Sequence, residues 1–179
     1  MMRWSKVTGG ALAASLLCLA TAPAAAEVTV TLAAPTTPAL GEIVAGTMPT
    51  VFRIGVDGSV TRISGDAVRL SNAPVTPPTM RLTCGLLNLA NLCLIRNIRI
   101  TMAPQASGTL ASVTMFHIGA ISGSTFSGGT PPDASTMNFQ LNPVGLGNVV
   151  TIQFGMDITV AAGQRGAAAT RYTVNTDFV

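Results

Sequence analysis

One segment carries the clearest structural signal in the chain: Thr50-Val51-Phe52-Arg53-Ile54-Gly55-Val56-Asp57-Gly58-Ser59-Val60-Thr61-Arg62-Ile63. Apolar and polar residues alternate on both sides of Asp57-Gly58, which is the pattern of two half-buried strands. Both residues of an Asp-Gly pair tolerate positive φ, so the pair favours a tight hairpin turn. The segment therefore predicts a β-hairpin over residues 50–63.

The same period of two continues along most of the chain. Alternating segments occur at 28–32, 80–84, 94–102, 111–121, 137–141, 150–160 and 172–178, and shorter strands are predicted at 43–46 and 67–70. Gly155 lies at the centre of segment 150–160 and indicates a bulge or a close neighbour there. A helical turn is favoured only at 86–92. About eight or nine strands separated by turn residues predict a β-sandwich or barrel.

The first 26 residues have the pattern of a secretory signal peptide. Arg3 and Lys6 precede an apolar run over 7–20, and small residues at 24–26 come just before Glu27. We expect cleavage after Ala26 and export to the periplasm or cell surface. The apolar run is too short for a membrane span, so we expect none after cleavage. Residues 27–179 then form a single domain, in which 27–38 is an extension and spacer.

Charge is sparse, at 9% of all residues. After the signal peptide, eight arginines and seven acidic residues remain, and the arginines stand singly between Arg53 and Arg171. Such a distribution offers no basic stripe to a phosphate backbone, so we expect no nucleic-acid partner. Weak repulsion between copies favours association instead. We expect self-association or contact with other surface subunits, with a periplasmic chaperone as a further candidate partner.

Two cysteines follow the predicted signal peptide, Cys84 and Cys93. In an oxidising compartment a closely spaced pair indicates a disulfide. Zinc is a poor alternative, because His117 is the single histidine and cannot complete a usual ligand shell with them. The loop between the cysteines either caps one end of the core or forms an exposed contact patch through its leucines, Leu86, Leu87, Leu89 and Leu92.

His117 is the first candidate for chemistry, since it lies in a strand-like run of apolar neighbours. It is either a satisfied structural residue or a catalyst, and catalysis would require it to sit exposed beside a carboxylate. The acids beside predicted turns, Asp57, Asp66 and Asp133, are expected to hydrogen-bond local backbone. The chain contains no nucleophile elbow, phosphate loop or His-Glu metal motif. We therefore expect a non-enzymatic protein without catalytic residues, cofactor or metal.

The two outermost alternating segments suggest assembly by donor-strand exchange. In one interpretation Val28, Val30 and Leu32 insert into a groove of a neighbouring copy, and the last strand lines the receiving core through Tyr172, Val174 and Phe178. In the other, segment 28–32 is the first strand of a complete sandwich and pairs within its own chain. Periodicity does not separate the two interpretations.

A family resemblance comes from both flanks of residues 27–179. Leu40-Gly41-Glu42-Ile43-Val44-Ala45-Gly46-Thr47 resembles the "Leu-x-Phe-Gly-x-Ile-x-x-Gly" opening of the bacterial domain-of-unknown-function family 4402. Asp57-Gly58-Ser59-Val60-Thr61 followed by Gly65 looks like that family's next element. The ending is similar to its "Gly-x-Tyr-x-Gly…Val-x-Val-x-Tyr" close, through Val160-Ala161-Ala162-Gly163-Gln164-Arg165-Gly166 and Tyr172-Thr173-Val174-Asn175. The resemblance implies a secreted, pilin-like β-sandwich at a Gram-negative surface, with no established enzymatic activity.

Together these patterns predict an all-β chain folded as an immunoglobulin-like, pilin-like β-sandwich of about eight to nine strands. The expected function is that of a structural or adhesive cell-surface subunit, with a fimbrial subunit that assembles by strand exchange as the specific form. The alternative is a self-contained periplasmic or extracellular binding module, whose contact region would be the loop 122–133. A binding module should show a formed pocket, whereas a fimbrial subunit should show an open groove or a detached first strand.

Overall fold

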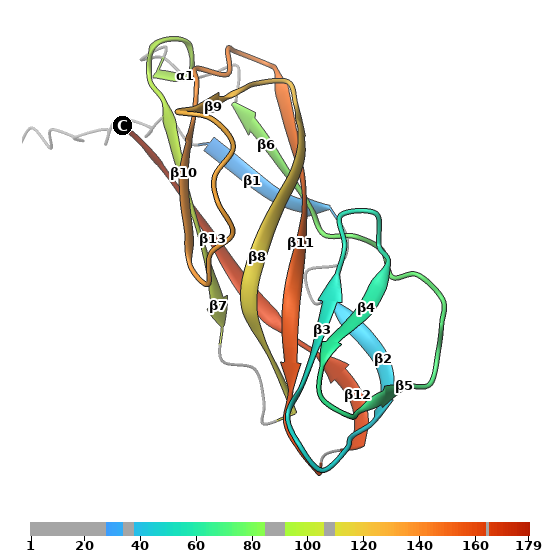
Figure 1. Cartoon of the computed structure of the whole chain (residues 1–179). Helices are drawn as coiled ribbons and strands as arrows, with labels where there is room; N and C mark the ends of the chain where they lie inside the picture. The colour runs from blue at the N-terminus through green and yellow to red at the C-terminus, as the bar shows by residue number, and fades with distance from the viewer. Residues whose placement is uncertain (1–27, 34–37, 85–91, 106–109, 164) are drawn as a thin grey trace, which may run out of the picture.

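The structure is a computed structural model that describes residues 28–33, 38–84, 92–105, 110–163 and 165–179. The described chain is mostly antiparallel β-structure, which confirms the predicted all-β class (Figure 1). The predicted hairpin is also confirmed, because β3 (Thr50–Ile54) pairs antiparallel with β4 (Val60–Ser64). Gly58 occupies the turn with a φ of 81°, a value that few residues other than glycine adopt.

The largest sheet is organised around β11 (Val149–Val160). One side of β11 pairs along nearly its whole length with β8 (Ala111–Ser122). The other side is shared, because β6 (Thr79–Cys84) pairs with the first half of β11 and β3 pairs with the second half. Beyond these two strands, β1 (Val28–Ala33) pairs with β6, and β4 pairs with β3. Three strands therefore pair directly with β11, which is the central strand of the sheet.

Two smaller sheets complete the described β-structure. The four-stranded sheet has the order β13 (Arg171–Phe178), β7 (Ile98–Gln105), β10 (Met137–Leu141) and β9 (Phe126–Ser127). The three-stranded sheet has the order β12 (Arg165–Ala169), β2 (Ala39–Val44) and β5 (Val68–Arg69). A single-turn helix, α1 (Leu92–Ile95), precedes β7. Figure 1 places α1 and the three-stranded sheet at opposite ends of the molecule.

The core lies between the six-stranded and four-stranded sheets. Tyr172 of β13 makes edge contacts with Phe116 of β8 and Phe154 of β11, at ring-centroid distances of 6.0 and 5.6 Å. Alternate residues of the facing strands are buried, as the period of two predicts: Met80, Leu82, Ile98, Ile100, Met102, Met137, Leu141, Ile152 and Met156. Apolar burial on facing sheets is the main source of stability in such an arrangement.

Gly155 has the close neighbour that its place in the sequence indicates. It lies opposite His117 in the β11–β8 register, and its other side faces the backbone of β3. A Cβ at position 155 would clash with the Ile54 carbonyl oxygen and would press closely against the backbone of Gly55 and Val56. The β8–β11 ladder also shifts register between Ile152 and Phe154 and between Asp157 and Ile158. The expected bulge is therefore confirmed, on both sides of Gly155.

Some local expectations are wrong, and each failure has a physical reason. Residues 92–95 form α1 instead of the start of a strand over 94–102, since the disulfide at Cys93 holds that turn against the core. The Gly/Ala-rich residues 165–169, for which no strand was predicted, form β12 by pairing with distant β2. The loop 122–133 contains the short strand β9. The predicted helical turn over 86–92 lies outside the described residues except for Leu92. The other leucines of the apolar loop also lie outside them: Leu86, Leu87 and Leu89.

The two segments proposed for strand exchange lie side by side at the edges of the two large sheets. Residues 28–33 pair with β6 of the same chain along all six positions, so Val28, Val30 and Leu32 lie opposite Cys84, Leu82 and Met80. In β13, Tyr172 is 6% exposed, and Val174 and Phe178 pack as partly buried residues against the core. Pairing within one chain does not exclude exchange between copies, so donor-strand assembly remains a prediction.

The predicted disulfide between Cys84 and Cys93 is confirmed, with a Cα–Cα distance of 6.3 Å. Both cysteines are buried, at 3% and 0% exposure. The bond ties the end of β6 to α1, and the carbonyls of both cysteines accept hydrogen bonds from the 145–147 turn. It therefore anchors one end of the core. In the described part of the chain, no helix is both long and apolar enough to cross a bilayer.

Replacing both Cys84 and Cys93 by Ala should lower the free energy of unfolding by about 2–3 kcal/mol, because the short loop gains freedom in the unfolded chain. Urea unfolding of the wild type and of this double variant measures the difference. Dithiothreitol should lower the wild-type midpoint to that of the variant and leave the variant unchanged. Equal midpoints for the oxidised wild type and the variant would contradict a stabilising role for the bond.

Candidate functional site: a charged network around His117

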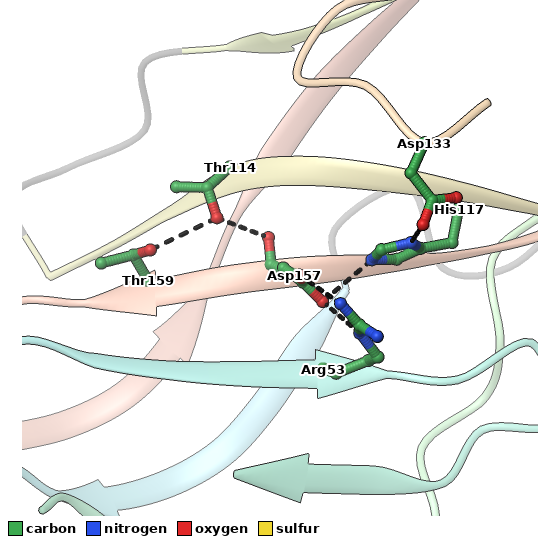
Figure 2. A network of polar contacts seen from close by, with 6 residues as sticks. All are labelled: Arg53, Thr114, His117, Asp133, Asp157 and Thr159. Atoms are coloured by element: carbon green, nitrogen blue, oxygen red, sulfur yellow. Dashed lines mark hydrogen bonds and ion pairs between the residues drawn. The ribbon is translucent and has the colours of Figure 1, made fainter. Parts of the chain in front are cut away.

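Four charged side chains gather on the outer face of the largest sheet, and we call Arg53, His117, Asp133 and Asp157 the charge network (Figure 2). They come from β3, β8, the segment before the Ala134 bridge, and β11. Strand alternation explains why Arg53 and Asp157 lie on this outer face, since their neighbours in sequence face the core. Residues far apart in sequence thus converge on one spot.

Asp157 is the centre of the charge network. It lies directly opposite Arg53 in the β3–β11 register. The guanidinium donates two hydrogen bonds to it, from Nε to Oδ1 at 2.7 Å and from Nη2 to Oδ2 at 2.8 Å. The Asp157 side chain is only 10% exposed, whereas that of Arg53 is 42% exposed. A bidentate pair of this geometry is stronger and more directional than an ordinary surface ion pair.

His117 lies between two carboxylates. Its Nε2 is 3.0 Å from Asp157 Oδ1, and its Nδ1 is 2.7 Å from Asp133 Oδ2. Ionised carboxylates only accept hydrogen bonds, so a ring nitrogen that carries a proton donates to the carboxylate beside it. The ring reaches Asp157 diagonally, because the residue opposite His117 is Gly155, which has no side chain. The His117 and Asp157 side chains are 14% and 10% exposed, whereas that of Asp133 is 55% exposed, so only the centre of the network is shielded from solvent.

Two local devices hold these residues in place. Phe116 and Ala134 form an isolated β-bridge, with N···O distances of 2.9 and 3.3 Å, and this bridge brings Asp133 beside His117. On the other side of His117, the register shift leaves Thr114 without a direct partner on β11. The Thr114 hydroxyl donates to the Asp157 carbonyl oxygen at 3.3 Å, and the Thr159 hydroxyl donates to Thr114 at 3.3 Å (Figure 2). Bulges re-aim side chains in this way.

The electrostatics of Asp157 follow from its neighbours. Burial by itself raises the pKa of Asp157, but hydrogen bonds and positive charge from Arg53 and His117 lower it by more. Its net pKa therefore lies below the ordinary value of an aspartic acid. The hydrogen bond to Asp157 likewise raises the pKa of Arg53. The ionised form of the pair is the stable one in the folded protein.

Acid should weaken the fold through Asp157. Because its folded pKa is depressed, its contribution is complete above the unfolded value of about 4 and is lost as pH falls through the folded pKa. We expect the free energy of unfolding of the wild type to fall more steeply below about pH 4 than that of Asp157→Asn. Urea unfolding between pH 7 and pH 2 measures both slopes. Parallel slopes would show that Asp157 is not stabilised by its partners.

The network does not have the arrangement of a hydrolytic site. His117 does sit beside carboxylates, but both ring nitrogens are engaged by them, and no described hydroxyl or thiol hydrogen-bonds to the ring. The two carboxylates approach opposite nitrogens and do not converge on one point. Across the described residues, no group of three or more His, Cys, Asp or Glu side chains could hold a metal ion. The arrangement instead links three strands and one loop.

The predicted local hydrogen bonding of the three turn acids is confirmed for only one of them. Asp57 accepts a hydrogen bond from the Ser59 backbone, as expected, and this bond and one from the Ser59 hydroxyl lower its pKa. Asp66 instead binds Thr47 and Met48, about 20 positions earlier in the chain, and Asp133 binds His117, so the expectation of local bonding is wrong for both. The charge network itself was missed. One signal was available, because Asp157 is the single charged residue in segment 149–160.

The other predicted residues lie away from the charge network. Cys84 and Cys93 sit at the α1 end, and Tyr172, Val174 and Phe178 are on β13. Burial raises the pKa of Tyr172 to about 12, and its hydroxyl has no hydrogen-bond partner among the described residues. The loop 122–133 contributes Asp133 to the network, but it does not line the pocket of about 540 Å³ that opens between β4 and β5.

Comparison of this chain with protein-family models, with curated proteins and with solved structures gives no match. The resemblance to family 4402 therefore remains a prediction that rests on the residues quoted for it.

Proposed function

We propose that the chain is a secreted, immunoglobulin-like β-sandwich that serves as a structural or adhesive surface subunit and assembles by exchange of its first strand. The observation that supports this proposal is the position of β1. It forms the edge of the six-stranded sheet and pairs with a single described strand, β6, over six consecutive residues. An edge strand of this kind can pair with the same β6 edge in another copy, which is the basis of strand exchange.

The sequence after β1 favours exchange as well. Residues 34–38 read Ala-Pro-Thr-Thr-Pro, and two prolines within a short connection restrict its backbone. Short, stiff connections favour the swapped form, because a strand held by them is relieved of strain when it pairs elsewhere. In the isolated chain β1 pairs with its own β6. In an assembly the same edge of β6 would pair with the β1 of a neighbour, with identical register.

The charge network suits a load-bearing subunit. It links β3, β11, β8 and the Asp133 segment across the sheet face that is not buried in the core. A sheet that joins copies end to end must resist shear between strands, and bidentate cross-strand pairs add directional resistance to sliding. In this proposal the imidazole is a cross-link and not a general base.

Size-exclusion chromatography with light scattering tests the proposal on residues 27–179 and on residues 35–179. We expect 27–179 to form assemblies larger than the monomer. The shorter chain should be monomeric and should bind a synthetic peptide of residues 27–34. A peptide with Val30→Asp is the matched control, because a charge in the alternating apolar set should prevent insertion. Unchanged monomers for both chains would remove strand exchange from the proposal.

A second candidate function is a self-contained binding module. The observation that favours it is the pocket between β4 and β5, together with the pairing of β1 inside its own chain. This function needs no assembly. It predicts monomers of 27–179 that bind a ligand at the pocket.

A further inference from the structure

The pocket lies where the edges of two sheets meet. Its volume is about 540 Å³, within the usual range for small-molecule sites. β4 is the edge of the six-stranded sheet and β5 is the edge of the three-stranded sheet, and the two lie near each other at one end of the molecule (Figure 1). The lining residues are Phe52, Val60, Arg62, Ala67, Val68, Arg69, Ser71 and Asn72.

One part of the pocket is apolar and well supported. Phe52 and Ala67 are 3% and 1% exposed, so they belong to the core. Val60 packs against the same core. The backbone around Ala67 is fixed, because the Thr50 hydroxyl accepts hydrogen bonds from the Asp66 and Ala67 amides at 3.1 and 2.9 Å. Phe52 and Ala67 therefore form a fixed support beneath the pocket. The apolar surface open to a ligand comes from half-buried Val60 and from Val68, which is 54% exposed.

Two arginines also line the pocket, and backbone carbonyls hold both of them in place. Arg62 Nη1 donates to the Ala67 carbonyl at 3.0 Å. Arg69 donates from Nε to the Leu40 carbonyl at 2.5 Å and from Nη2 to the Ala73 carbonyl at 2.8 Å. No carboxylate among the described residues lies within ion-pair distance of either guanidinium. Most of their N–H groups, five on each side chain, are thus left to a ligand.

We propose that this pocket binds a small organic carboxylate with a compact apolar body. The arginines supply positive charge and planar N–H pairs that match a carboxylate, while Val60 and Val68 contact the apolar part. Ser71 and Asn72 also line the pocket. The proposal deepens the binding-module function and rests on it, and it holds whether or not copies assemble through β1.

Titration of isotope-labelled protein (residues 27–179) with phenylacetate, followed by NMR, tests the assignment. Amide signals of 52, 60–62 and 67–72 should shift together in a saturable way. Arg62→Gln should weaken binding about tenfold, whereas Arg171→Gln, on exposed β13, should leave it unchanged. Binding by Arg62→Gln that equals wild type, or shifts that map elsewhere, would overturn the proposal.

Two further ligands are tested on the wild-type protein, so this part of the experiment does not require that any variant folds correctly. Neutral 2-phenylethanol should bind at least about tenfold more weakly than phenylacetate, because it lacks the charge. Inorganic phosphate should also bind more weakly, because it has no apolar part. Equal binding of the alcohol would overturn the role of the arginines, and equal binding of phosphate would overturn the ligand class. Chromatography of 27–179 is unaffected by either result, so failure here is distinct from failure of strand exchange.

Discussion

Gly155→Ala should destabilise the protein by about 3 kcal/mol, although Ala normally suits a strand better than Gly. The added Cβ would meet the Ile54 carbonyl oxygen and the backbone of Gly55 and Val56. These are backbone atoms, which cannot rotate away as a flexible side chain can. Relief requires β3 and β11 to separate, and this would break the pairing that carries Arg53 and Asp157.

Thermal and urea unfolding measure the effect of Gly155→Ala. Gln153→Ala is the matched control, because Gln153 is exposed on the same strand and two residues away. It should change stability by less than about 0.5 kcal/mol. If the Gly155 variant is as stable as wild type, the close approach of β3 to β11 is not a real constraint on the fold.

Asp157→Ala should cost about 2–3 kcal/mol, because it removes the common acceptor of Arg53 and His117. The guanidinium of Arg53 and the Nε2 atom of His117 would then both lose their hydrogen-bond partner. The reverse change, Arg53→Gln, should cost less, about 1 kcal/mol, since the Arg53 side chain is 42% exposed and can return to water.

A double-mutant cycle separates pairing from other effects of these changes. Asp157→Ala, Arg53→Gln and the double variant are unfolded in urea at pH 7. We expect the double variant to be less destabilised than the sum of the single changes, by about 1 kcal/mol, because the single changes share one interaction. Strict additivity would mean that the Arg53–Asp157 pair stores no interaction energy.

The strands with clear alternation could be predicted from sequence, because a strand with one buried face has an apolar residue at every second position. The 50–63 hairpin and segment 137–141 follow this rule, and the structure has them at nearly the predicted bounds. β12 could not be found in this way. Its residues, Arg165 and a Gly/Ala run, have no apolar period, and the strand forms through pairing with β2 over 120 positions away.

The charge network was out of reach for a related reason. Arg53 and Asp157 are 104 positions apart, and each occupies an ordinary polar position of an alternating strand. Only the register of β11 between β3 and β8 brings them together with His117. The pocket has the same origin, because Arg62 and Arg69 face one space only after the edges of two sheets meet.

The most direct test of the proposed assembly is cysteine cross-linking between β1 and β6. Thr31 and Arg81 lie opposite each other in the register. Chains that carry Thr31→Cys alone and Arg81→Cys alone are mixed, oxidised and run on a non-reducing gel, with Thr31→Cys and Thr173→Cys as the control mixture. Strand exchange predicts a disulfide-linked dimer of the first mixture that is absent from the control. If cross-links form only in a chain that carries both Thr31→Cys and Arg81→Cys, and always as monomers, β1 serves its own chain and the assembly proposal is wrong.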